Sequence, residues 1–187
     1  MEIVQRARAM VVSPASEWRA IEPESGDPGY LFANYAAILA AIPAVCAFVR
    51  GRLFSWDGFR FHHHFGLFGG LFGAVLHWVG ALVMVYVMAV VIDGVAPTFS
   101  VQNNREGAMK LAVYSLTPAW LAGVFALVPG LGFLRFLALV YCAYVFWLGL
   151  PVLMKPPPDK LGSYAIAVVL SAVLLSMVIA AIVGPAL

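Results

Sequence analysis

Charge is scarce in this chain: of its 187 residues only 11% are Asp, Glu, Lys or Arg, whereas 63% are hydrophobic. A soluble domain has roughly 25% charged residues, which cover its water-facing surface. So little charge excludes an ordinary soluble globular protein. The net charge of +2 gives no reason to expect nucleic acid as a partner, and we expect membrane lipids instead.

Residues with catalytic or metal-binding chemistry are also few. The two cysteines, Cys46 and Cys142, fall in apolar runs without metal-ligand spacing, and we interpret them as small core residues. The sequence has no nucleophile elbow, no glycine-rich phosphate loop and no paired carboxylates in an apolar run, so it predicts neither an enzyme nor a cofactor. His62, His63 and His64 are direct neighbours whose side chains diverge, which predicts a loop and not a metal site.

Long apolar runs are what the chain does have. Five stretches of about twenty apolar residues follow one another, separated by short polar breaks. A helix that is apolar on every side over that length must be surrounded by lipid or by similar helices. The pattern predicts an all-α integral membrane protein, with five transmembrane helices in one bundle over residues 30–187. The predicted spans are 30–49, 70–92, 108–128, 131–154 and 164–184.

The N-terminal segment, residues 1–29, contains signals for two short helices. Apolar side chains recur at helical spacing over residues 1–12, which predicts an amphipathic helix on the membrane surface, with a frayed polar leader as the alternative. Ser13 and Pro14 suit the N-cap and first positions of a second helix. Trp18 is then expected at the depth of the lipid headgroups.

Lysine and arginine near the ends of spans predict the orientation, because cytoplasmic segments carry an excess of them. With the N-terminus inside, seven such residues lie on the inner side and four on the outer side. We therefore predict a cytoplasmic N-terminus and, after five spans, an external C-terminus. The inner set is Arg6, Arg8, Arg19, Arg105, Lys110, Lys155 and Lys160, and the outer set is Arg50, Arg52, Arg60 and Arg135.

The second span has the most regular pattern of small and polar residues. Gly66, Gly70, Gly73, His77 and Gly80 share one helical face, since they are spaced alternately by four and three residues. Small residues let another backbone approach closely, so we predict that this face packs, within one chain or between two copies. For His77 we expect a hydrogen bond to another helix, with a proton or substrate role as the alternative. The candidate partners are Asn34, Ser115, Thr117, Tyr141 and Tyr144.

Prolines fall inside three of the spans, at Pro43, Pro118 and Pro151, and each removes one backbone donor. We interpret them as fixed kinks that improve packing, with the lining of a transport path as the alternative. The third and fourth spans are separated only by Pro129-Gly130 and its neighbours. So short a connection predicts an antiparallel helical hairpin.

The connection between the last two spans contains three consecutive prolines between Lys155 and Lys160. Such a run predicts a stiff, extended loop whose lysines meet anionic headgroups or an acidic partner. A rigid turn with no further role is the alternative. Together with Trp18, these two lysines are the candidate cytoplasmic docking residues.

Several short motifs occur in a fixed order along the chain. They are the run Ala112–Gly123, the turn Pro129–Gly132, the pair Tyr141 and Tyr144, and the run Gly149–Lys155, preceded by the segment Ser13–Trp18. Together they resemble the bacterial branch of the Yip (Ypt/Rab-interacting protein) domain family. The resemblance implies a five-helix membrane bundle with a cytosolic N-terminus. For the eukaryotic branch of the family the resemblance implies binding of prenylated Rab-type GTPases. Members of that branch have an Asp-Leu-Tyr-Gly-Pro motif. That motif is absent here, so we do not expect this partner.

Two functions fit these features. The first is a non-enzymatic scaffold or adaptor at the cytoplasmic face of a bacterial inner membrane, with a membrane protein or a second copy of the chain as its partner. The second is a small channel or transporter whose path runs past His77.

Overall fold

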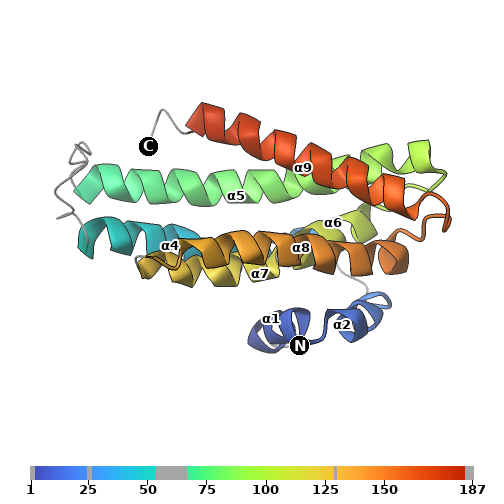
Figure 1. Cartoon of the computed structure of the whole chain (residues 1–187), viewed down its shortest axis with the longest axis horizontal. Helices are drawn as coiled ribbons and strands as arrows, with labels where there is room; N and C mark the ends of the chain where they lie inside the picture. Colours follow the sequence, from blue (N-terminus) through green and yellow to red (C-terminus); the bar gives the residue numbers. More distant parts are fainter. Residues whose placement is uncertain (1–2, 25–26, 54–66, 129, 184–187) are drawn as a thin grey trace.

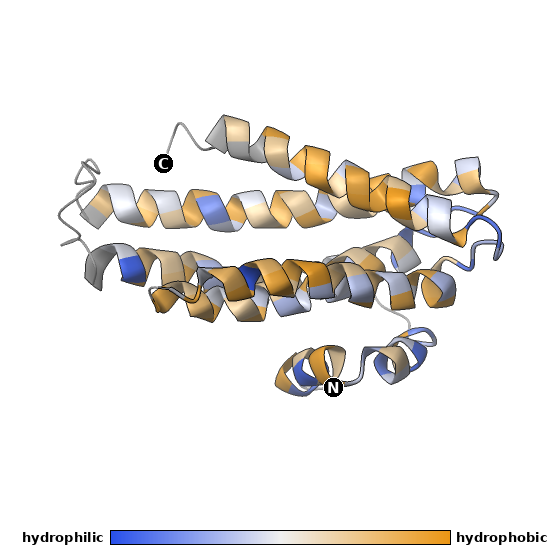
Figure 2. Cartoon of the chain, in the orientation of Figure 1, coloured by the Kyte–Doolittle hydropathy of each residue, from blue (hydrophilic) through white to orange (hydrophobic). Residues whose placement is uncertain are grey.

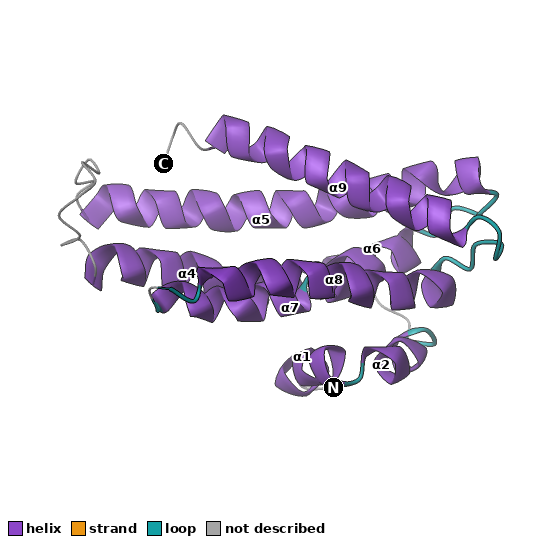
Figure 3. Cartoon of the chain, in the orientation of Figure 1, coloured by secondary structure: helices purple, strands orange, loops and turns teal. Residues whose placement is uncertain are grey.

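The computed structural model describes residues 3–24, 27–53, 67–128 and 130–183, and these residues form helices without a strand (Figure 1, Figure 3). Five stretches are long and apolar enough to cross a membrane, and they lie side by side in one bundle. Each overlaps one predicted span, so the predicted all-α membrane fold is confirmed. The stretches are Pro28–Gly51, Phe68–Phe99, Arg105–Leu127, Gly132–Leu153 and Leu161–Val178.

Most of these spans are built from more than one helical segment. The first contains α3 (Pro28–Leu31), the π-helical turn η1 (Phe32–Ala36) and α4 (Ala37–Leu53). The second contains α5 (Leu67–Val95) and η2 (Ala96–Phe99), and the third contains α6 (Arg105–Ser115), α7 (Thr117–Leu121) and η3 (Ala122–Leu127). The last two are α8 (Gly132–Leu153) and α9 (Leu161–Val183). As the short connection predicts, α8 runs back along α7 and η3.

Hydrophilic residues gather at one end of the bundle and beside it (Figure 2). At that end α5 leads through η2 into α6, and α8 is connected to α9. Helix α6 begins there after Asn104, whose side chain accepts a hydrogen bond from the amide of Gly107 at 2.9 Å and so caps the helix. We call this the polar end of the bundle.

The residues before the first span form an N-terminal arm, residues 3–24, that lies along one side of the bundle (Figure 1). It consists of α1 (Ile3–Val12) and α2 (Pro14–Ile21), so the second helix begins at Pro14, as predicted. The arm packs against α6, α7 and α8. The helix predicted for residues 1–12 is present, and its buried residues Ala7 and Met10 pack on the bundle, a contact that the sequence does not predict.

One of the three predicted kink prolines lies where the first and third spans meet. Pro43 is buried inside α4, which continues through it, and Pro151 lies inside α8 in the same way. Pro118 follows the break at Leu116 where α6 ends and α7 begins. Opposite Pro43 stands Gly123, where an added Cβ would lie only 2.7 Å from the Cα atom of Pro43. Pro43 thus lies at a close contact between backbones and not beside an open path.

The buried face of α5 is not the face that the glycine pattern predicts. Val85 and Ile92 are fully buried, and Trp78 donates from Nε1 to the carbonyl of Ala37 on α4 at 2.8 Å. His77 is exposed. At 3.6 residues per turn, the predicted face is rotated by about 100° from the one that packs. The prediction differs because larger side chains, with Trp78 as anchor, fix the rotation of α5 within this chain.

The four predicted glycines have different surroundings. A Cβ at Gly70 would lie 3.3 Å from Phe48 on α4, which is a close contact near the end of both helices. Gly73 is half-buried, and a Cβ at Gly80 would meet nothing within 4 Å. Gly66 lies outside the described residues. The contact at Gly70 fits the predicted packing, whereas the open space at Gly80 does not.

Substituting alanine for two glycines separates packing from helix propensity. Gly123→Ala forces Pro43 and its helix away, and overpacking of this kind costs about 1–3 kcal/mol, so we expect a lower midpoint of thermal unfolding in detergent. Gly80→Ala adds a methyl group to open space and gains about 1 kcal/mol in helix propensity, so its midpoint should be unchanged or higher. Equal shifts in both variants would contradict the packing described for α4 and η3.

Candidate functional site

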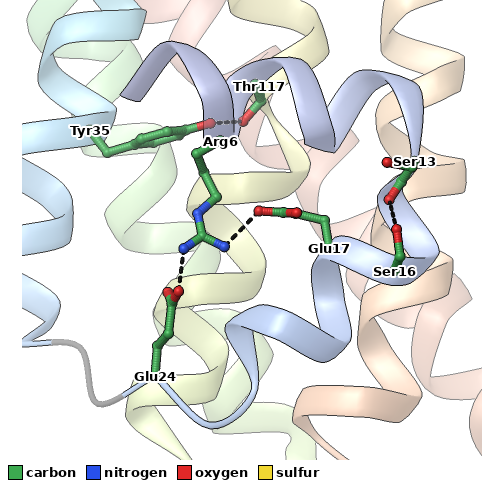
Figure 4. Close-up of polar contacts among 7 residues, drawn as sticks. All are labelled: Arg6, Ser13, Ser16, Glu17, Glu24, Tyr35 and Thr117. Atoms are coloured by element: carbon green, nitrogen blue, oxygen red, sulfur yellow. Dashed lines mark hydrogen bonds and ion pairs between the residues drawn. The ribbon is translucent and has the colours of Figure 1, made fainter. Parts of the chain in front are cut away.

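The N-terminal arm is held by a buried charge cluster centred on Arg6. The residue is only 5% exposed, and its guanidinium donates hydrogen bonds to Glu17 at 2.6 Å and to Glu24 (Figure 4). Both carboxylates belong to the arm itself. Burial alone would lower the pKa of Arg6, but the hydrogen bond that it donates to Glu24 and the nearby negative charges outweigh burial and raise that pKa. Arg6 therefore stays a cation between the arm and the bundle.

Aromatic residues of the bundle form the other side of this cluster. The guanidinium carbon of Arg6 lies 5.7 Å from the ring centroid of Tyr114 on α6, within the range of a cation–π contact. Tyr114 packs edge-on against Tyr35 of the first span, with 4.8 Å between ring centroids. The hydroxyl of Tyr35 shares a hydrogen bond of 2.9 Å with the hydroxyl of Thr117 (Figure 4). Arg6 thereby connects the arm to the first and third spans at once.

Two lysines fix the point where the arm ends. Lys110 on α6 is 6% exposed, donates to the backbone carbonyl of Glu24, and pairs with Glu106 at 2.7 Å. Lys155, at the end of α8, pairs with Glu22 at 2.6 Å. Each lysine comes from a different span. The arm is therefore tied to both α6 and α8 just before the chain enters the first span.

Trp18 is the main apolar anchor of the arm. The ring is fully buried, and its Nε1 donates to the carbonyl of Val145 on α8 at 2.9 Å. A Cβ at Gly149 would lie 2.5 Å from Cε2 of the ring, so only glycine leaves room for it. A fully buried ring is not accessible for the predicted docking role of Trp18, whereas its predicted depth among the headgroups stays a prediction. The ring faces the bundle because Gly149 opens a space of its size.

The arm lies beside the bundle and not at its tip. The hydroxyl of Tyr141 donates to the carbonyl of Val11 near the end of α1, at 2.8 Å. Tyr141 is about 18 Å from Leu153, the last residue of α8, at 1.5 Å per residue. The hydrocarbon core of a bilayer is about 30 Å thick. Helix α1 is therefore level with the middle of the spans, where an unpaired charge is costly.

Four of the five side chains predicted as partners of His77 have other contacts. Thr117 bonds to Tyr35 and Tyr141 bonds to Val11, as described above. Asn34 is exposed and donates to the carbonyl of Tyr30 one turn earlier, at 3.1 Å. Ser115 is buried, and its hydroxyl has no hydrogen-bond partner among the described residues. Tyr144 is exposed and packs on the ring of Tyr141 at 5.6 Å.

The two predicted docking lysines both lie at the polar end. The Lys155 side chain is 69% exposed despite its ion pair with Glu22. Lys160 donates to the hydroxyl of Ser100, in the connection before α6, at 2.6 Å. Among the described residues there is no group of three or more His, Cys, Asp or Glu side chains suited to a metal ion. His62–His64 lie outside these residues.

Sequence reasoning missed the residues that make this site. The sequence predicts Arg6 and Lys110 only as basic residues of the inner side. It does not predict the contacts of Arg6 with Glu17 and Glu24, or that of Lys110 with the carbonyl of Glu24. One signal was available, because several acidic residues of a charge-poor chain follow its two N-terminal arginines within a few turns. Opposite charges so concentrated beside apolar spans favour pairing.

Removing the charge of Arg6 should release the arm. In Arg6→Gln the carboxylates of Glu17 and Glu24 lose their cation, and breaking a buried pair costs about 3–5 kcal/mol. We measure release as the rate at which a polar maleimide labels Met10→Cys, a fully buried position. Cys46 and Cys142 are first replaced by alanine. Labelling should be much faster than in the parent.

Arg8→Gln is the matched control, since Arg8 is on the same helix but exposed. It should label as slowly as the parent. Equally slow labelling in Arg6→Gln would show that the ion pairs do not hold the arm.

Comparison with known proteins agrees with the motifs noted in the sequence. The chain is 29% identical to the inner membrane protein YohC of Escherichia coli over 175 residues, which cover 89% of this chain and 90% of the relative. The same values hold for strain K12 and for the O6:H1 strain. No solved structure matches. The model of the Yip1 domain matches residues 8–181, from α1 into α9, and the chain therefore belongs to the Yip1 domain family.

Proposed function

We propose that the chain is a non-enzymatic scaffold or adaptor in a bacterial inner membrane, with its polar end at the cytoplasmic face. The observation that carries the proposal is the fixed arm, which holds charged groups from three parts of the chain in one place. Members of the cluster bind one another, which suits a structural role. The name of the relative supports an inner membrane location.

The orientation is supported by basic residues. At the polar end the described residues include Arg105, Lys155 and Lys160, whereas Arg50 and Arg135 lie toward the opposite end. Cytoplasmic segments carry the excess of such residues. Arg50 also donates to the carbonyl of Ala126 at 3.2 Å, so part of its donor capacity is used within the bundle. We therefore propose that the polar end, with the end of α2 beside it, faces the cytoplasm.

The loop between α8 and α9 is the proposed docking edge. Lys155 is tied to Glu22 at one end of it and Lys160 to Ser100 at the other. The amide of Lys160 also donates to the carbonyl of Pro157 at 2.9 Å. Pro158 and Asp159 are exposed between these ties. A loop already fixed in this way loses little conformational entropy when a partner binds.

The alternative, a transport path near His77, has less support. His77 is exposed on the outside of α5. The polar cavity described below lies instead between α2, α6 and α8, and His77 does not line it. A path through the spans requires a polar and roomy interior.

Site-specific photocrosslinking in native membranes tests the proposed docking edge. A photoreactive residue at Asp159 should give a discrete adduct with a partner protein or a second copy of the chain. The control position is Phe133, which is 60% exposed at the other end of the bundle, on α8, and should give lipid adducts only. Lipid adducts alone from both positions would contradict the scaffold proposal.

A further inference from the structure

A cavity of about 520 Å³ opens at the polar end, between the arm, the start of α6 and the end of α8. Five charged side chains line it: Arg19 and Glu22 from the arm, Glu106 and Lys110 from α6, and Lys155 after α8. Its volume falls in the range of about 300–1,000 Å³ typical of small-molecule sites. The cavity exists only while the arm is docked, since α2 forms one wall.

Ion pairs account for four of these five charges. Glu22 pairs with Lys155 at 2.6 Å, and Glu106 pairs with Lys110 at 2.7 Å. Arg19 is exposed and has no ion-pair or hydrogen-bond partner among the described residues. The cavity thus has a net charge of +1, and its unpaired group is a guanidinium. The planar fork of a guanidinium matches two oxygens of a phosphate group.

The position of the cavity matches the depth of phospholipid headgroups. Its lining includes Val152 and Leu153, the last residues of the fourth span, next to the charged groups. Apolar side chains beside charged groups of net charge +1 suit a headgroup phosphate whose glycerol and ester groups continue toward the bilayer. Anionic lipids attract basic groups at the cytoplasmic surface.

We propose that this cavity binds a phosphate group through Arg19, with Lys155 as a second contact. The phosphate comes from an anionic phospholipid or from a small soluble phosphate compound, and the experiment below distinguishes these two sources. The inference does not depend on the scaffold role, because it requires only the docked arm and the charges around it.

The test is native mass spectrometry of the full-length protein in detergent micelles, with three probes: phosphatidylglycerol, phosphatidylcholine and inorganic phosphate. We expect one saturable phosphatidylglycerol per chain and weaker binding of zwitterionic phosphatidylcholine. Arg19→Gln should weaken the binding of phosphatidylglycerol about fivefold or more, since one basic group near anionic lipid contributes about 1 kcal/mol.

Two further variants separate the cavity from general charge effects. Glu22→Gln removes a carboxylate from the wall and frees Lys155, and it is compared with the parent once slow labelling of Met10→Cys shows that the arm is still docked. Binding should then become tighter, which loss of folding cannot produce. Arg8→Gln removes an exposed arginine from the same arm outside the cavity and should leave binding unchanged. Equal weakening by Arg8→Gln and Arg19→Gln, or weakening by Glu22→Gln, would overturn the proposal.

Competition between inorganic phosphate and phosphatidylglycerol identifies the source of the bound phosphate group. If millimolar inorganic phosphate leaves phosphatidylglycerol bound, the site takes a lipid headgroup. If inorganic phosphate binds with the same dependence on Arg19 and displaces the lipid, the site takes a soluble phosphate compound. No saturable binding of any probe would overturn the proposal, while the crosslink from Asp159 would still decide the scaffold role separately.

Discussion

The burial of Arg6 is the interaction on which the position of the whole arm depends. A guanidinium buried between the arm and the bundle without a carboxylate partner would lower the stability of the fold by several kcal/mol. Two carboxylates reach it only when α2 folds back beside α1, because Glu17 and Glu24 come from α2 and the turn after it. A buried pair of this kind often adds little net stability compared with apolar residues of the same size. Its effect here is to specify one arrangement of α1, α2 and α6, because other arrangements would leave the buried charge of Arg6 unpaired.

The five spans could be predicted from the sequence because the lipid requirement for apolar residues applies to each span independently of its neighbours. Lipid excludes unpaired backbone groups and charges, so any spanning segment must be a long apolar helix, whatever its neighbours are. The rotation of a span about its axis has no such local cause. For α5 it is set by Trp78, which reaches the carbonyl of Ala37, and by Val85 and Ile92. A glycine pattern shows where a close approach is possible, and the neighbouring helices determine whether it happens.

The arm could be predicted as two helices but not as part of the core. Arg6 and Arg8 are equivalent in an amphipathic pattern, yet Arg6 is 5% exposed and Arg8 is exposed. The difference arises from tertiary contacts of Arg6, with Glu17 and Glu24 of the arm and with Tyr114 on α6. Trp18 and Val145 are 127 positions apart and meet only because Gly149 leaves room for the ring. Neither the glycine nor the tryptophan indicates its partner when the sequence is read locally.

Among the five spans, the buried share falls as the mean hydropathy rises. The polar side chains inside the bundle are therefore concentrated in its most buried span. The third span has the lowest hydropathy, 1.3, and is 67% buried, whereas the second has a hydropathy of 2.4 and is 17% buried. Protein neighbours can pair polar groups that lipid would leave unpaired. Lys110, Tyr114 and Thr117 are therefore acceptable in the third span only while other parts of the chain cover them. The arm supplies much of that cover, and release of Arg6 would open the part of the bundle where polar groups are concentrated.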